Sequence, residues 1–267
     1  MTCDEAKTAL EKHLGDIQLM QSLLSEVVPA DLAVTEEELV AFKEAGRVAS
    51  DGNIDLRRGY ILIDLDVAEP GLDPQPVSVM SHAEPRRVLA NMAGRFYARQ
   101  PETVVAVTGT NGKSSTVDFL RQMWTAGGLK AASIGTLGVA TAAGRRPLAH
   151  TTPDPVEIHA ALDGLVGEGV TCVALEASSH GLLQHRIDAV NVTAVGFTNL
   201  TQDHFDYHAD FEDYFEAKMR LFEALAPKGA PAVVNPDGPW GAKVVERARK
   251  AGLDVRTFGW AGEDLHL

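Results

Sequence analysis

The sequence predicts an α/β protein with a mostly parallel sheet flanked by helices, preceded by a small irregular region. Short runs rich in Val, Ala and Ile are predicted strands, at residues 104–107, 131–134, 171–175, 192–197, 232–234 and 255–258. Segments with a helical apolar period alternate with these runs, near residues 114–127, 155–167, 211–226 and 239–251. Strands linked through helices need crossover connections, which make neighbouring strands parallel and cover both faces of the sheet. Ligands of such sheets bind at the carboxyl ends of the strands.

Residues 1–81 are less regular, and we expect them to form a separate region before a domain at residues 82–267. Apolar residues at helical spacing predict a helix over 6–20, and Thr35 with Glu38 has the spacing of a helix-capping box. Residues 60–65 are a predicted strand.

The composition is that of a folded chain, because the 267 residues are 45% hydrophobic and 23% charged. The net charge of −13 disfavours nucleic acid as a partner, although a few backbone amides and one lysine can still bind a small anion. Cys3 and Cys172 are too far apart in sequence for a metal knuckle or a redox pair. Asp4 and Glu5 are unlike the start of a signal peptide, and no apolar run reaches the roughly 18 residues of a membrane span. We therefore expect a cytoplasmic protein that does not contact a membrane.

A glycine-rich segment between a strand and a helix predicts a phosphate-binding loop. The strand at 104–107 leads into Thr108-Gly-Thr-Asn-Gly-Lys-Ser-Ser, and an apolar helical period follows at Val117, Leu120, Met123 and Trp124. Glycines let the loop amides face an anion, the helix N-terminus adds positive potential, and Lys113 can reach the outer phosphates. The GxxGKS spacing is shorter than the usual motif. The alternative is an ordinary glycine-rich turn with a solvated lysine.

Acidic and histidine residues follow two other predicted strands. Glu176 ends the strand at 171–175, on the same edge of the sheet as the loop, where a carboxylate can hold a nucleotide-bound Mg²⁺. The strand at 192–197 is followed by two acids and two histidines within residues 203–208, a possible metal site or simply polar surface. No cysteine lies near enough to complete a familiar zinc spacing.

Lys218 stands out because it interrupts an apolar helical stripe. The stripe consists of Phe211, Tyr214, Phe215, Leu221, Phe222 and Leu225. A lysine on a buried face must be paired, neutralised or modified. Two alternatives stay open: its ammonium group reaches solvent, or it is a desolvated amine that reacts, for example with carbon dioxide to form a carbamate.

Five motifs in order resemble the Mur ligase family. They are TGTNGKSS at 108–115, HTTPDP at 150–155, EASSHGLLQHR at 176–186, FTNLTQDHFDYH at 197–208 and YFEAKMRLF at 214–222. The resemblance implies the central ATP-binding domain of an amide-bond ligase of peptidoglycan precursor synthesis. Such a ligase adds the third stem-peptide amino acid, diaminopimelate or lysine, to UDP-MurNAc-L-Ala-D-Glu by way of an acyl phosphate.

The resemblance also implies roles for individual residues. ATP would be held by Gly109, Thr110, Asn111, Gly112, Lys113, Ser114 and Ser115. One Mg²⁺ would be held by Ser114 and Glu176, and a second by His204 and carbamylated Lys218, so that Lys113, Lys218, His204 and Glu176 form the catalytic set. The UDP-MurNAc-dipeptide would be bound by His150, Thr151, Thr152, Ser178, Gln184 and Arg186.

The two ends of the chain depart from the family. Residues 51–59 resemble at most a degraded version of the family's uridine-binding segment, and residues 257–267 resemble the middle of the family's central domain. We therefore expect an incomplete ligase without the C-terminal domain, in which exposed strand edges favour self-association. The alternatives are a catalytically incomplete nucleotide-binding remnant or interaction protein, or another ligase of this fold such as a folylpolyglutamate or cyanophycin synthetase.

Overall fold

The computed structural model describes residues 84–148, 150–201 and 210–266, together with the backbone of four short strands before residue 84. The chain divides into two compact units, Met1–Phe96 and Tyr97–Leu267. No helix in the part of the chain that the structure describes is long and apolar enough to cross a membrane.

The first unit holds two small sheets and a helix among its described residues. β1 pairs antiparallel with β3, and β2 pairs parallel with β4. The bounds are β1 Arg47–Val48, β2 Tyr60–Asp64, β3 Glu69–Pro70, β4 Ser78–His82 and α3 Pro85–Phe96. The strand predicted at 60–65 is thus confirmed, whereas the predicted helix over 6–20, the capping box at 35–38 and the segment 51–59 lie outside the described residues.

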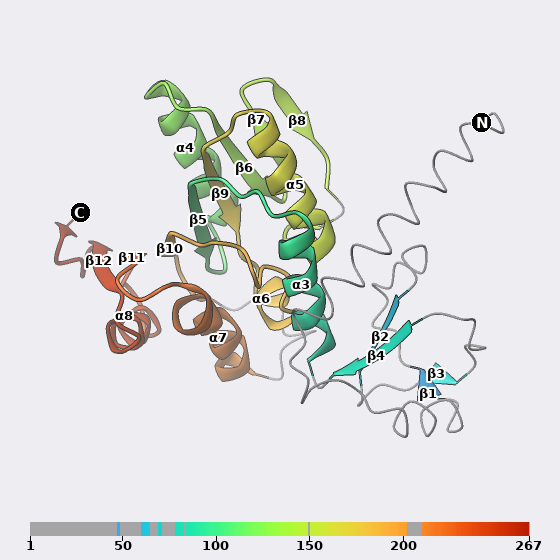
Figure 1. Cartoon of the computed structure of the whole chain (residues 1–267). Coiled ribbons are helices and arrows are strands. Elements are labelled where there is room, and N and C mark those ends of the chain that lie inside the picture. Colours follow the sequence, from blue (N-terminus) through green and yellow to red (C-terminus); the bar gives the residue numbers. More distant parts are fainter. Residues whose placement is uncertain are drawn as a thin grey trace. The chain divides into compact units, whose positions relative to one another are not determined.

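The second unit is built on a nine-stranded sheet in the order β13-β12-β11-β10-β5-β9-β6-β7-β8 (Figure 1). β7 runs antiparallel to β6 and to β8, and the other neighbours are parallel. The strands are β5 Thr103–Thr108, β6 Ala131–Gly135, β7 Gly138–Thr141, β8 Gly144–Arg146, β9 Cys172–Glu176, β10 Ala194–Phe197, β11 Pro231–Val234, β12 Asp254–Gly259 and β13 Leu265–His266. The predicted α/β class with a mostly parallel sheet is confirmed.

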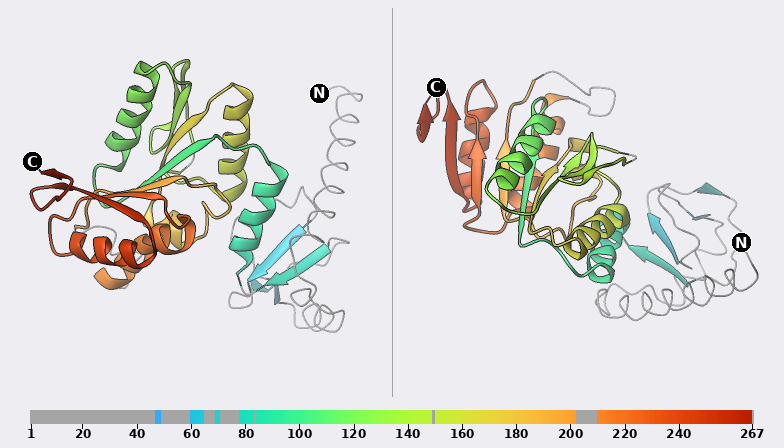
Figure 2. Two further views of the ribbon diagram at one scale, coloured as in Figure 1. Left: turned by 60° about the vertical axis from the view of Figure 1, so that its left-hand side comes forward. Right: turned by 90° about the horizontal axis from the view of Figure 1, so that it is seen from above.

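Helices cover both faces of this sheet (Figure 2). Alternate residues of a strand face opposite sides, and on β5 Val104 and Ala106 join the main core while Val107 packs with Val117 of α4. Because α5, α7 and α8 all contribute to the main core, they lie on the face opposite α4. The helices are α4 Lys113–Ala126, α5 Pro155–Gly167, α6 Ser179–Leu183, α7 Phe211–Arg220 with the π-helical turn η3 Leu221–Leu225, and α8 Gly241–Lys250.

The strand order changes direction at β5, which makes this strand the switch point of the sheet. The chain leaves β5 toward β6 on one side and, after β9, continues with β10 on the other side. The carboxyl ends of β5, β9 and β10 are therefore neighbours at one edge of the sheet, the edge at which ligands of such sheets bind.

The apolar side chains of α4 are only partly buried. Met123 belongs to the predicted apolar period of α4, yet its side chain is 69% exposed. Phe119, one turn earlier, is 61% exposed. Val117 is buried and Leu120 and Trp124 pack beside it. The helical period identifies residues that share a face, but only tertiary packing decides how wide the covered face is.

Candidate functional site

The loop between β5 and α4 depends on two glycines with positive φ. Gly109 has a φ of 144° and Gly112 a φ of 86°, conformations that residues with a Cβ rarely adopt. A Cβ on Gly109 would also lie 1.9 Å from Oγ1 of Thr198. The loop therefore needs glycine at 109 for both conformation and space, and it presents the N-terminus of α4, starting at Lys113, at the switch point.

The segment after β10 fixes the shape of this loop. The amide of Thr110 donates to the carbonyl of Asn199 at 2.9 Å, and the amide of Asn111 donates to Oδ1 of the same residue at 2.9 Å. The hydroxyl of Thr198 donates to the carbonyl of Asn111 at 2.6 Å. Thr198 and Asn199 fall within the FTNLTQDHFDYH motif at 197–208, but residue patterns alone gave these two residues no role.

Two lysine amines meet at one carbonyl oxygen of the loop. Nζ of Lys113 donates to the carbonyl of Gly109 at 2.9 Å and to that of Thr110 at 2.8 Å. Nζ of Lys218, from α7, donates to the same Gly109 carbonyl at 3.2 Å. Like charges this close repel one another, so an anion bound here would relieve repulsion as well as gain attraction.

Lys218 is buried, so its ammonium group does not reach solvent. The residue is 1% exposed, and its Nζ lies 4.1 Å from the ring centre of Tyr214. The hydroxyl of Tyr214 lies 3.2 Å from Oγ1 of Thr110 in the loop. Tyr214 therefore connects both lysine and loop, a role that its place in the apolar stripe did not reveal.

Glu176 lies beside the loop because of the strand register. It is the last residue of β9 and pairs with Val107 of β5, two residues before Gly109. Its side chain is only 1% exposed, and its carboxylate accepts hydrogen bonds from the amide and, at 3.4 Å, the hydroxyl of Thr136. Gly135 makes room for it, since a Cβ there would lie 2.0 Å from Oε1 of Glu176.

The HTTPDP and EASSHGLLQHR segments come together next to Glu176. The hydroxyl of Thr152 donates to the carbonyl of Glu176 at 2.9 Å, and the amide of Ser178 donates to that hydroxyl at 3.0 Å. Arg186 donates from NH1 to the carbonyl of Thr152 at 2.8 Å and from Nε to Oε1 of Gln184 at 2.9 Å. Four of the side chains predicted to bind substrate are thus linked to one another, and Thr152 links them to the Glu176 carbonyl.

The remaining predicted site residues are less closely defined. Thr151 lies 3.1 Å from Thr136, oxygen to oxygen, while His150 is exposed. Ser114 is half-buried and Ser115 exposed in the first turn of α4. His204 lies in 202–209, outside the described residues. Among the residues that are described, no three His, Cys, Asp or Glu side chains gather as a metal cluster.

A glycine-rich loop lies at the switch point of a mostly parallel sheet, and two lysine side chains donate hydrogen bonds to its backbone. These features define a phosphate-loop α/β protein. The Mur ligase middle domain matches residues 107–267, and the chain belongs to the Mur ligase family.

Named bacterial ligases are similar to much of this chain. The UDP-N-acetylmuramoyl-L-alanyl-D-glutamate–2,6-diaminopimelate ligase of Agrobacterium fabrum is 55% identical over 192 residues, covering 72% of this chain and 39% of that protein. The ligase of the same name from Rhizobium meliloti is 49% identical over 243 residues, covering 91% of this chain and 48% of that protein. The chain therefore spans less than half the length of these curated relatives.

Solved structures share the fold. A UDP-N-acetylmuramoyl-L-alanyl-D-glutamate–2,6-diaminopimelate ligase matches with a TM-score of 0.64 at 28% identity, covering 72% of this chain and 40% of that chain. A bifunctional folylpolyglutamate synthase/dihydrofolate synthase from Yersinia pestis, complexed with AMPPNP and Mn ion, matches with a TM-score of 0.52 at 20% identity, covering 70% of this chain and 49% of that chain. The second likeness is one of fold alone.

Proposed function

We propose that this chain is the nucleotide-binding part of an ATP-dependent ligase that adds 2,6-diaminopimelate to UDP-MurNAc-L-Ala-D-Glu in peptidoglycan precursor synthesis. The observation that carries the proposal is the meeting of Lys113 and Lys218 on the Gly109 carbonyl, inside a phosphate loop. Relatives with that name are about half identical in sequence, which favours this reaction over folylpolyglutamate synthesis. The names also favour diaminopimelate over lysine as the amino acid added.

The reaction would proceed in two steps. A carboxylate oxygen of the muramoyl-dipeptide bonds to the γ-phosphorus of ATP while the bond to the β,γ-bridging oxygen breaks, and ADP leaves. The amine of diaminopimelate then attacks the acyl carbon, loses a proton and displaces phosphate. Carboxylate and triphosphate repel each other, so catalysis here is mainly positioning and charge stabilisation. Lys113 supplies positive charge at the loop, and Arg186 is suited to hold a carboxylate or phosphate.

The chemistry of the site fits Mg²⁺. Glu176 and Ser114 offer hard oxygen donors, which Mg²⁺ prefers, and the Glu176 carboxylate keeps lone pairs beyond those that accept from Thr136. When bound, Mg²⁺ would offset the negative charge of the phosphates. His204 and carbamylated Lys218 are proposed to hold a second ion.

Carbamylation of Lys218 agrees with its surroundings. The neutral amine would bond to carbon dioxide and release one proton, which replaces a buried cation with an anion. The carbamate N–H can still donate to the Gly109 carbonyl that Nζ now contacts. Incubation with ¹³C-labelled bicarbonate should give a carbamate carbon signal that is lost in Lys218→Arg.

Calorimetric titration with ATP and Mg²⁺ tests the nucleotide site. Lys113→Ala should weaken ATP binding at least tenfold, because a charge-assisted hydrogen bond contributes about 1.5–3 kcal/mol. Lys130→Ala is the matched control, since this exposed lysine donates to the Glu168 carbonyl and should bind ATP within twofold of wild type. Equal affinity of Lys113→Ala and wild type would overturn the proposal.

An ADP-release assay with the UDP-muramoyl-dipeptide tests the substrate, with diaminopimelate and lysine compared as amines. Release that depends on the dipeptide and is faster with diaminopimelate is expected. ATP binding without ADP release would instead support a nucleotide-binding remnant.

We further propose that the chain acts in the cytoplasm, where ATP is available.

We also propose that the chain self-associates through β11 to β13. Val233 of β11, Trp260 just after β12 and Leu265 of the edge strand β13 are 45%, 75% and 61% exposed, and exposed apolar side chains near a sheet edge favour association. Light scattering should show a mass that rises with concentration and falls in Trp260→Ser; a monomer at all concentrations would contradict it.

A further inference from the structure

The turn after α6 contains a histidine where glycine is the usual residue. His185 has a φ of 56° and follows Gln184, the cap of α6. Its amide donates to the carbonyl of Leu182 at 3.2 Å, and the amide of Arg186 donates to that of Gly181 at 2.8 Å. This is the Schellman arrangement, whose left-handed position favours glycine because a Cβ is crowded there. An interaction of the imidazole should therefore compensate for the backbone conformation.

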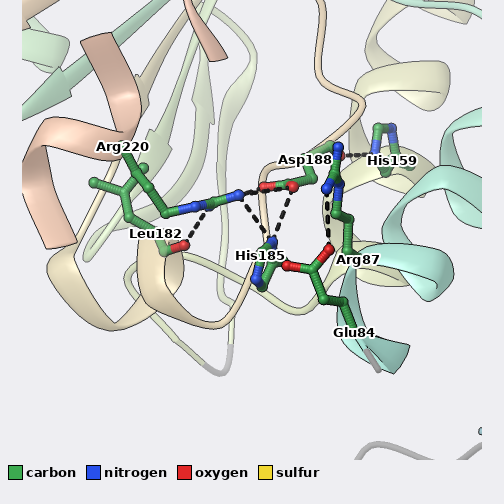
Figure 3. A network of polar contacts seen from close by, with 7 residues as sticks. All are labelled: Glu84, Arg87, His159, Leu182, His185, Asp188 and Arg220. Atoms are coloured by element: carbon green, nitrogen blue, oxygen red, sulfur yellow. Dashed lines mark hydrogen bonds and ion pairs between the residues drawn. The ribbon is translucent and has the colours of Figure 1, made fainter. Parts of the chain in front are cut away.

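An arginine from α7 supplies that interaction (Figure 3). Arg220 donates to the carbonyl of Leu182 at 2.6 Å and to the two carboxylate oxygens of Asp188 at 3.1 and 2.9 Å. Nδ1 of His185 lies 2.8 Å from NH2 of Arg220 and 3.0 Å from Oδ2 of Asp188. The imidazole is thus fixed between the guanidinium and the carboxylate, and the turn is attached to α7 at three points.

Asp188 keeps its negative charge although it is largely buried in the cluster that it forms with His185 and Arg220. The side chains of His185, Asp188 and Arg220 are 19%, 8% and 23% exposed. Burial alone would raise the pKa of Asp188, but its hydrogen bonds with His185 and Arg220 and the charge of Arg220 outweigh burial and lower that pKa. A bidentate pair of this kind fixes geometry as well as charge.

Helix α7 connects this turn to the phosphate loop. Arg220 ends the helix, and two residues earlier Lys218 donates to the Gly109 carbonyl. On the other side of His185, Arg186 donates to Oε1 of Gln184 and to the carbonyl of Thr152. One rigid helix therefore contacts both the loop proposed to hold ATP and the turn that carries two side chains proposed to hold the dipeptide.

We propose that His185, Asp188 and Arg220 are positioning residues that hold Gln184 and Arg186 in register with the phosphate loop for binding of the muramoyl-dipeptide. This rests on the proposed function. The imidazole stabilises the left-handed turn, which orients the Arg186 guanidinium against Gln184 and Thr152. The cluster acts through Arg186 and does not itself touch the reacting atoms.

Substitutions at position 185 separate the side chain from the backbone. His185→Gly removes the imidazole and places at residue 185 the amino acid that adopts the left-handed conformation most easily. His185→Ala also removes the imidazole, but its Cβ keeps the free-energy cost of the left-handed conformation. Each variant is measured for unfolding midpoint, for calorimetric affinity toward ATP and the UDP-muramoyl-dipeptide, and for the ¹⁵N–¹H signal of Nε of Arg186, assigned by its loss in Arg186→Lys.

We expect His185→Gly to unfold near the wild-type midpoint, to bind ATP within twofold of wild type, and to bind the dipeptide about tenfold more weakly than wild type. Its Arg186 Nε–H signal should shift and exchange faster with solvent. Asp188→Asn should change the same two readouts, whereas Asp163→Asn, which removes the Arg99 ion pair, should change neither.

A His185→Gly protein with an unchanged Arg186 signal and unchanged dipeptide affinity would show that His185 serves only the turn, and would overturn the proposal. If the wild-type chain binds no dipeptide, the proposed function fails; the Arg186 signal in His185→Gly then decides the positioning role by itself.

Discussion

Gly135→Ala should displace Glu176 from its place beside the phosphate loop. A Cβ at residue 135 would lie 2.0 Å from Oε1 and 2.5 Å from Cδ and Cγ of Glu176. The carboxylate cannot stay at that distance, and its 2.8 Å hydrogen bond from the Thr136 amide is lost when it moves. Overpacking costs about 1–3 kcal/mol, and a hydrogen bond to a charged group contributes about 1.5–3 kcal/mol. Because the two costs partly overlap, we expect a loss of about 3 kcal/mol.

This loss corresponds to a decrease of roughly 6–12 °C in the unfolding midpoint for a domain of this size. Calorimetric titration should also show that Mg²⁺ no longer strengthens ATP binding, since Glu176 is a proposed ligand. Gly196→Ala in β10 is the matched control, because its Cβ would make an ordinary 3.5 Å contact with Cγ2 of Val107. If Gly135→Ala melted with wild type and kept its Mg²⁺ dependence, the close approach of Gly135 and Glu176 would have no functional meaning.

Two further substitutions test the contact between Tyr214 and the loop and the effect of a buried histidine on stability. Tyr214→Phe removes the 3.2 Å contact with Thr110 and should cost about 1 kcal/mol in chemical denaturation, with ATP affinity reduced less than tenfold because the ring beside Lys218 remains; a loss as large as that of Lys113→Ala would contradict this. His159 is fully buried, and burial lowers its pKa. The unfolded chain therefore takes up the proton first, so the contribution of His159 to stability is complete above about pH 6.5. It is lost as the pH falls toward the folded-state pKa, by about 1.4 kcal/mol for each pH unit that separates the two pKa values. Denaturation at pH 7.5 and 5.5 should show a smaller loss of stability in His159→Gln than in wild type, and equal losses would argue against the lowered pKa.

Local patterns predicted six of the nine strands of the second unit and its four longer helices, whereas β7, β8, β13 and α6 were not predicted. The phosphate loop could be predicted because its parts are adjacent in the chain. They are a strand, the glycines at 109 and 112, and an amphipathic helix that begins at Lys113. The hairpin strand β8 was missed because its three residues, Gly144–Arg146, are all exposed and show no apolar alternation. Short α6 was missed because five residues carry too little helical period to recognise.

The partners of the predicted site residues were beyond the reach of local patterns. The apolar stripe showed that Lys218 is unusual, but its contact at Gly109 is 109 residues away in sequence. Glu176 was expected at a strand end, yet the space that Gly135 leaves for it depends on β6 and β9 being neighbours. His185 showed no signal at all, since its left-handed φ and its contact with Arg220 exist only in the folded chain.

Local residue patterns were enough to predict the class of fold, the phosphate loop and the residue types of the site, because hydrophobic period and glycine placement act over a few neighbouring residues. Tertiary structure decided that two amines share one backbone oxygen, that a carboxylate lies against a glycine, and that one helix connects the loop to the turn at Arg186. Those arrangements depend on strand order and register, which bring together residues that no local pattern relates.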